Sequence, residues 1–426
     1  MLVKPQATHM NAYARIILLM TAGEGIFVLP FLLARIFRPT FLKVFEVNNF
    51  QLGTLYTTYG VVALMSYLFG GTLADRYPPR KLMGVALIMT AMGGFFMASF
   101  PGFIALQILY GYWGFSTTFL FWAAMIKATR NWGGEENQGR AFGLLEGGRG
   151  IVAATIGALG ILVFANLIQG QVTESSLLQI KEAFRWVILF TSIVVSLTGV
   201  IIYFYLQEVG SSEEDSEKTH KPLKNIKSVL KYSSVRLLIV VVLCAYCGYK
   251  VTDILSLYAS EIMLFDEIDA AKVGSYQMYL RPLVCIIIGI VADQSSNAKW
   301  LIRGFLLLFI GALMFTSGTI QAPLNSLFIT AVIITGLSTY GLRTLYFAAV
   351  KEGHVPYTYM GTAVGIISVV GYTPDIFMGP LMGYLLDTYP GILGFRWVFL
   401  FLAIFSSVGF FTSLRFMKTA KINTKA

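Results

Sequence analysis

The stretch GGTLADRYPPRK, Gly70 to Lys81, lies between two long apolar runs and places an acid, Asp75, where a helix would leave an apolar environment. Glycines precede this acid, and the basic residues Arg76, Arg80 and Lys81 follow it. The carboxylate of Asp75 meets the negative end of its own helix dipole, so it needs a positive partner from elsewhere. We therefore interpret the stretch as a charged latch between helices and not as a spacer.

The rest of the chain is strongly apolar. Of its 426 residues, 56% are hydrophobic and only 13% are charged, whereas about 25% of the residues in soluble domains are charged. Apolar runs of about 20 residues are long enough to cross a bilayer as helices. We count twelve such runs, at about 12–34, 51–73, 82–100, 102–127, 141–168, 184–207, 236–258, 273–292, 300–320, 326–349, 361–386 and 394–416. The sequence thus predicts an all-α membrane protein.

The net charge of +10 arises from basic residues at the ends of these runs, which does not favour nucleic-acid binding. If the N-terminus is cytoplasmic, the cytoplasmic loops carry most of the lysines and arginines, as the positive-inside rule requires. This orientation puts both termini in the cytoplasm, and it puts Arg35, Arg38 and Lys43 in the first outside loop. No Asn-x-Ser/Thr site occurs, so we expect a bacterial inner membrane.

The two halves of the chain repeat one another. IIGIVADQSSNAK, Ile287 to Lys299, is a counterpart of the first stretch, and it places Asp293 about 218 residues after Asp75. GRAFGLLEGGRG at 139–150 has a counterpart, GTAVGIISVVGY, about 222 residues later. Two pairings at nearly one offset predict a duplication of six spans, the parallel repeat of some transporters. The predicted units are an N-terminal bundle at 1–207, a linker at 208–234 and a C-terminal bundle at 235–426.

The linker turns basic and amphipathic over residues 221–232. Leu223, Ile226 and Leu230 would share one face of a helix, and lysines would occupy another face. A short helix lying on the anionic inner leaflet fits this pattern. A disordered linker is the alternative.

The twelve spans, the repeat and the loop motif resemble the major facilitator superfamily, in particular its uncharacterised bacterial members. The family motif, roughly G-x-L-A-D-R-x-G-R-K, is matched at Gly71, Leu73, Ala74, Asp75 and Arg76. Pro78 and Pro79 depart from it. The resemblance implies that Gly71, Asp75 and Arg76, with their counterpart Asp293, regulate the opening of the bundle.

The resemblance also bears on the subfamily. Drug–proton antiporters of this superfamily carry a Gly-Pro motif on span five, and the run GGRGIVAATIGALG lacks the proline. Sugar-phosphate carriers would have an arginine deep in span one and a cation in span seven. Span one has Glu24 instead, so the sequence does not favour that class.

Eight ionisable residues fall deep within predicted spans, where each costs about 2.5–3.5 kcal/mol unless it has a partner or a function. They are Glu24, Glu146, Asp253 and Asp375, and Arg149, Lys250, Arg281 and Arg343. Most lie beside glycine or proline, where transporters build sites from bent helices. By this count the N-terminal half has an excess acid and the C-terminal half an excess base.

These residues suggest roles. We expect Glu24, with Asp375, to carry a coupling proton, because burial favours the neutral form of a carboxyl group. The expected substrate-binding residues are Arg281, Arg343, Lys250, Asp253, Trp122, Tyr249 and Tyr346. Glu146 and Arg149 are expected to act in gating. The alternatives are structural: Lys250 and Asp253 can neutralise each other across one helix turn, and Glu24 can form a static bridge to Arg281 or Lys250.

The predicted function is secondary transport of a small polar or anionic solute, such as an organic acid, sugar acid or amino acid, by proton-coupled import. Efflux of drugs or metabolites is the first alternative, and a non-transporting receptor is the second. No clustered catalytic residues, metal ligands or nucleotide-binding loop are recognised, so we expect neither an enzyme nor a cofactor. The expected partners are the solute, protons and membrane lipids, and we expect a monomer.

Overall fold

The computed structural model describes residues 11–133, 138–168, 176–206, 226–353 and 357–423. The described part of the chain is helical, with no strands. Its N-terminal half contains α1 (Ala12–Phe27), η1 (Val28–Leu32), α2 (Leu33–Ile36), α3 (Arg38–Phe45), α4 (Asn49–Arg76), α5 (Pro79–Met97), α6 (Phe103–Gly114), η2 (Phe115–Trp122), α7 (Ala123–Gly133), α8 (Gln138–Leu167) and α9 (Leu177–Tyr205). Its C-terminal half contains α10 (Ile226–Leu230), α11 (Ser233–Val251), η5 (Thr252–Ile254), α12 (Leu255–Glu261), α13 (Glu267–Asp293), α14 (Asn297–Thr316), α15 (Asn325–Glu352), α16 (Tyr357–Gly371), α17 (Pro374–Thr388) and α18 (Ile392–Asn423).

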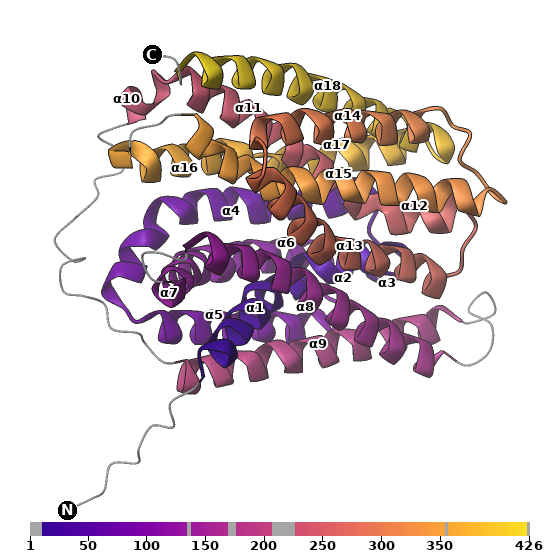
Figure 1. Ribbon diagram of the computed structural model, residues 1–426. Helices are drawn as coiled ribbons and strands as arrows, with labels where there is room; N and C mark the ends of the chain where they lie inside the picture. Colours follow the sequence, from indigo (N-terminus) through magenta and orange to yellow (C-terminus); the bar gives the residue numbers. More distant parts are fainter. Residues whose placement is uncertain (1–10, 134–137, 169–175, 207–225, 354–356, 424–426) are drawn as a thin grey trace, which may run out of the picture.

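The predicted spans are confirmed as helices. Among the described residues, ten helical segments are long and apolar enough to cross a membrane. Two further crossings are made by α4 and by the continuous segment α6–η2–α7, which run the length of the bundle beside them (Figure 1). Both are rich in glycine, threonine and tyrosine, which lowers their hydropathy. The eleventh crossing is broken between α16 and α17, at the weak point that the sequence indicates beside Pro374.

The two halves form two layers (Figure 1). The helices α1 to α9 lie in the lower layer of the view and most of α11 to α18 in the upper one, whereas α13 slants down to pack against α8. We call the end of the bundle where α1 begins and α18 ends the terminal end, at the left of the figure. The other end, which carries α3 and the end of α17, is the distal end.

The halves meet along two helix pairs, α4 with α17 and α8 with α13. Glycines allow the first pair to touch backbone to backbone. A Cβ atom at Gly53 would overlap the carbonyl group of Gly379, and one at Gly383 would overlap the carbonyl group of Asn49. The second pair is close at Gly150, where a Cβ atom would lie 2.8 Å from the ring of Pro282. These contacts bring the charged residues of both halves to one central space.

Polar contacts reinforce the joint at the distal end. The carboxylate of Asp387 on α17 accepts hydrogen bonds from the backbone N–H groups of Phe50, at 2.7 Å, and of Asn49, at 3.2 Å, and so caps α4. Arg38 donates to the side-chain oxygen of the same Asn49, at 3.0 Å and 3.1 Å. Lys43 pairs with Glu267 at 3.2 Å. The bundle is therefore closed at its distal end.

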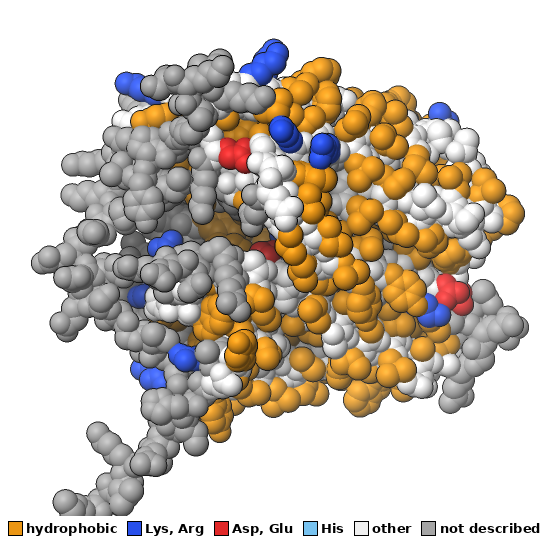
Figure 2. All heavy atoms as spheres, in the orientation of Figure 1, with side chains coloured by type: hydrophobic (Ala, Val, Ile, Leu, Met, Phe, Trp, Pro, Cys, Tyr) orange, Lys and Arg blue, Asp and Glu red, His pale blue; other side chains and the backbone are white. Residues whose placement is uncertain are grey.

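The outer surface is apolar. Ile104, Ile108, Leu178 and Phe204 are each at least two-thirds exposed. Figure 2 shows hydrophobic side chains over the middle of the visible face, with most of the visible lysine and arginine side chains in the left half, toward the terminal end. An exposed apolar surface of this extent matches lipid contact and not water.

The described part of the linker is α10. It packs against α11 and α16, and Val229 is fully buried there. Residues 207–225 lie outside the described residues. The division into two bundles at 1–207 and 235–426, and the contact of 221–232 with anionic lipid, stay predictions.

Candidate transport site

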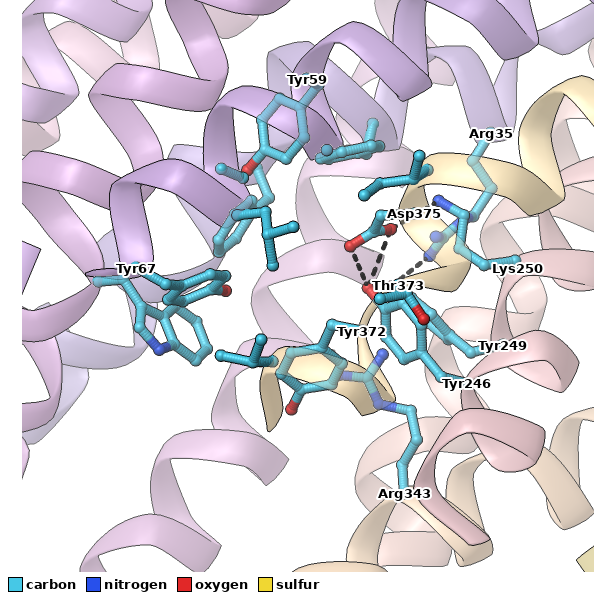
Figure 3. A pocket seen from close by; sticks show the side chains of 18 of the residues that line it. Arg35, Tyr59, Tyr67, Tyr246, Tyr249, Lys250, Arg343, Tyr372, Thr373 and Asp375 are labelled. Atoms are coloured by element: carbon cyan, nitrogen blue, oxygen red, sulfur yellow. Dashed lines mark hydrogen bonds and ion pairs between the residues drawn. The ribbon is translucent and has the colours of Figure 1, made fainter. Parts of the chain in front are cut away.

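A cavity lies between the two halves, about midway along the helices. The cavity has a volume of about 100 Å³. One wall comes from α1, η1, α2, α4, η2 and α8, and the other from α11, α15, α16 and α17. Figure 3 shows Tyr59 and Tyr67 on one side of this space, and Lys250, Arg343 and Asp375 on the other.

A chain of four alternating charges lies on the distal side of the cavity. Arg35 Nε lies 2.5 Å from Asp253 Oδ1, and both side chains are at most 4% exposed. Lys250 Nζ lies 3.2 Å from Asp253 and 3.3 Å from Asp375. Tyr246 donates its hydroxyl to the same Asp375, at 3.0 Å. The chain runs from the first span to the seventh and the eleventh, so it joins the two halves.

A second group of four charges forms a closed ring. Arg149 pairs with Glu24 at 3.1 Å and with Glu146 at 2.7 Å. Arg281 pairs with the same two acids, at 3.4 Å and 2.8 Å. Three members belong to the N-terminal half, and Arg281 alone comes from the C-terminal half. The ring therefore also joins the halves, through one guanidinium group.

Arg343 differs from the other cavity cations. No ion pair joins it to any acid among the described side chains. Its guanidinium carbon lies 4.0 Å from the ring centroid of Tyr249 and 5.8 Å from that of Tyr246. Such cation–π contacts orient the group without neutralising it. Figure 3 shows its side chain rising from α15 beside Tyr372 into the space.

Irregular turns of helix place these residues. The π-helical turn η1 contains Pro30 and presents Phe31 to the cavity, and the π-helical segment η2 presents Trp122. In the seventh crossing the 3₁₀ turn η5 holds Asp253. Asp375 lies in the first turn of α17, just after the break that Pro374 makes. Local departures from α-helix often mark functional sites.

The residues predicted from sequence divide into those that line the cavity and those behind it. The cavity is lined by Glu24, Trp122, Arg149, Tyr249, Lys250, Arg343 and Asp375. Behind this lining, Asp253, Arg281 and Glu146 pair with lining residues, and the hydroxyl of Tyr346 lies 3.4 Å from that of Tyr372. The predicted pair of Lys250 and Asp253 is present, but it is part of a larger chain of charges.

The predicted latch residues lie away from the cavity: Gly71, Asp75 and Arg76 are in the last turns of α4, and Asp293 ends α13. Arg76 is exposed, and the side chains of Asp75 and Asp293, like the surroundings of Gly71, lie outside what the structure describes. Beside them, Lys127 of α7 donates to the backbone carbonyl of Ala74 at 2.9 Å. The gating role of these residues stays a prediction.

Two arginines were misplaced by the sequence analysis. Arg35 and Arg38 were assigned to an outside loop, but they are 4% and 1% exposed. Arg35 belongs to α2, which continues the first crossing, and it lines the cavity. Two predictions were therefore wrong. The N-terminal half has no excess acid, and the absence of an arginine on span one cannot be used against phosphate-bearing substrates.

Twelve crossings, a charged cavity between two halves and a sealed distal end define a membrane transporter. The chain belongs to the Major Facilitator Superfamily, whose family model matches residues 16–374. The resemblance seen in the loop motif is thus confirmed over nearly the whole chain.

Relatives and solved structures agree with this assignment. The chain is 26% identical to the inner membrane protein YqcE of Escherichia coli, over 88% of each chain. It is 27% identical to the inner membrane protein YihN of Escherichia coli, over 94% of each. The fold matches a bacterial homolog of the human lysosomal transporter Spinster, with a TM-score of 0.72, 14% identity and coverage of 96% and 97% of the two chains. A mutant of the nucleoside transporter NupG matches with a TM-score of 0.70, 13% identity and coverage of 96% and 100%. The protein is a multi-pass inner membrane protein of this transporter family.

Proposed function

We propose that this protein moves a small polar or anionic solute, such as an organic acid, sugar acid or amino acid, by alternating access and coupled to protons. The observation that carries the proposal is Arg343, the cavity cation with no ion-pair partner among the described side chains. A guanidinium group presents a planar fork of donors that matches a carboxylate. The other cations at the cavity already have carboxylate partners.

The formal charges around the cavity support an anion. The cavity lining and its ion-pair partners hold five bases and four acids, namely Arg35, Arg149, Lys250, Arg281 and Arg343 against Glu24, Glu146, Asp253 and Asp375. One positive charge remains at the point where Arg343 faces the space. A monoanion bound there would complete the balance, which is what a low-dielectric site requires.

The test is binding by the Arg343→Gln variant. We expect its affinity for the anionic ligand to fall by about ten- to a hundredfold, because a hydrogen bond to a charged group contributes about 1.5–3 kcal/mol. The thermal shift of the purified full-length protein is screened against organic acids, sugar acids, amino acids, phosphate esters and lipophilic cations. Arg303→Gln is the matched control, because Arg303 is an exposed arginine on α14. Stabilisation of the wild type by lipophilic cations alone would contradict the proposal.

Two carboxyl groups are candidates for the coupling proton, Glu24 and Asp375. Glu24 lies between two guanidinium groups, and protonation would remove its attraction to both. Asp375 is 19% exposed to the cavity and has one cationic partner, Lys250. We therefore favour Asp375 as the proton carrier and Glu24 as part of the joint between the halves.

Proteoliposome transport separates these roles. Asp375→Asn is expected to abolish uptake driven by a pH gradient while leaving exchange of labelled for unlabelled solute, because the site still binds and cycles. Glu24→Gln is expected to slow both reactions together. If Asp375→Asn keeps its proton dependence and Glu24→Gln loses it, the roles are reversed.

Import is the direction that we propose, with both termini in the cytoplasm and a single chain as the working unit. The aromatic residues in the cavity wall favour the alternative of metabolite efflux, since exporters of amphiphilic compounds need apolar cavity surface. Uptake into right-side-out vesicles, compared with inverted vesicles, decides between them.

A further inference from the structure

The two walls of the cavity differ in chemistry. The wall from the N-terminal half carries five aromatic rings, those of Phe27, Phe31, Tyr59, Tyr67 and Trp122. They form a connected series: the ring of Trp122 lies 6.1 Å from that of Phe27 and 6.5 Å from that of Tyr67, edge to face. Further along, Phe31 lies 4.6 Å from Tyr59. A ligand bound against this wall would contact the faces and edges of aromatic side chains.

Two polar groups of the aromatic wall, the hydroxyl of Tyr59 and the guanidinium group of Arg149, are already engaged. The hydroxyl of Tyr59 is hydrogen-bonded to that of Thr117 at 2.6 Å. Arg149 is held by its two acids, and its guanidinium carbon lies 5.5 Å from the ring of Phe27 and 5.9 Å from that of Trp122. A hydroxyl-rich ligand placed here would face ring surface more than hydrogen-bonding groups, and an unmet hydrogen bond in a buried site is costly.

The opposite wall carries the group that attracts an anion. Arg343 faces the space from α15, with Tyr246 and Tyr372 beside it, whose ring centroids are 4.8 Å apart (Figure 3). The hydroxyl of Tyr246 is engaged by Asp375. A single carboxylate on Arg343 would therefore leave the rest of a ligand facing the aromatic wall.

We infer that the substrate class is a monoanion that carries an aromatic ring, with its carboxylate on Arg343 and its ring against Trp122, Phe27 and Tyr67. This inference rests on the proposed function, because it assumes that Arg343 binds an anion. Ring burial supplies apolar contact, and edge-to-face geometry adds to it. Because Arg343 is one cation without an ion-pair partner among the described side chains, we expect the ligand to carry one negative charge. The inference excludes sugar acids, which the proposed function admits.

The test compares four small ligands on the purified full-length protein: benzoate, cyclohexanecarboxylate, gluconate and benzylamine. We expect benzoate to give the largest thermal shift, cyclohexanecarboxylate a smaller one, and gluconate and benzylamine none. Trp122→Leu is expected to weaken benzoate binding about tenfold, through loss of the ring contact. Trp186→Leu is the matched control, because Trp186 is half-exposed on the outer face of α9, and it should bind benzoate as the wild type does.

The outcomes separate this inference from the proposed function. If the protein binds gluconate but not benzoate, and Arg343→Gln abolishes gluconate binding, the aromatic substrate class is wrong and the proposed anion site at Arg343 stands. Benzoate binding that Trp122→Leu and Trp186→Leu leave equally unchanged would also overturn it. Stabilisation by benzylamine alone would overturn both proposals. If Trp122→Leu does not fold, Tyr67→Leu tests the same wall.

Discussion

Replacing Asp253 with asparagine is expected to reduce the free energy of unfolding by about 3–5 kcal/mol, because it leaves two buried cations short of their shared partner. Arg35 and Lys250 both pair with Asp253, and all three side chains are at most 4% exposed. Thermal unfolding of the purified full-length protein measures the loss. Removing Arg35 as well should restore part of it, since the net charge around the site would return to its wild-type value.

Asp269→Asn is the control for this experiment. Asp269 also forms an ion pair three residues along a helix, with Lys272 at 2.7 Å, but its side chain is 52% exposed. An exposed pair contributes about 0–1 kcal/mol, so this variant should unfold close to the wild-type temperature. Equal effects of the two substitutions would show that the burial of Asp253 has no energetic consequence.

Replacing Gly53 with leucine is expected to stop the distal end from closing and so to abolish transport while the protein stays folded. The helices α4 and α17 touch there through backbone atoms, and even a Cβ atom at Gly53 would overlap Gly379. The two halves would have to separate at that end. Gly289→Leu is the matched control, because a Cβ atom at Gly289 of α13 meets nothing within 4 Å.

Thiol labelling detects the separation. Ser256 is buried at the distal end, where its hydroxyl donates to the backbone carbonyl of Arg35 at 2.7 Å. Ser256→Cys, made after replacing the three native cysteines with alanine, should react slowly with a water-soluble reagent. The same thiol should react many times faster when Gly53→Leu is added. Unchanged labelling together with lost transport would contradict this explanation.

Much of the fold could be predicted from the sequence, because the length of each apolar run is a local property. The charged residues of the site were also found locally, since Glu24, Asp253 and Asp375 interrupt apolar runs. Their partners could not be predicted in the same way. The ion pair between Arg281 and Glu146 joins positions 135 residues apart. It depends on the approach of α8 to α13, which Gly150 allows.

The misplacement of Arg35 has a physical reason. In the run LLARIFRPTFLK two arginines and a lysine end an apolar stretch, which is typical of a span reaching water. The burial of Arg35 depends on Asp253, and nothing near position 35 indicates that partner. The sequence signal that could have indicated the burial of Arg35 is Asp253, an acid at nearly the equivalent point of the second half.

The ion pair between Arg35 and Asp253 joins positions 218 residues apart, and the same interval separates Asp75 from Asp293. The pair thus links nearly corresponding points of the two repeats, close to the pseudo-twofold axis that relates them. Two identical copies assembled about that axis would set arginine against arginine, or aspartate against aspartate, in a buried place. This joint therefore requires unlike halves. A single chain whose two halves have diverged in sequence can form this buried Arg–Asp pair. A symmetric dimer of either half cannot form it.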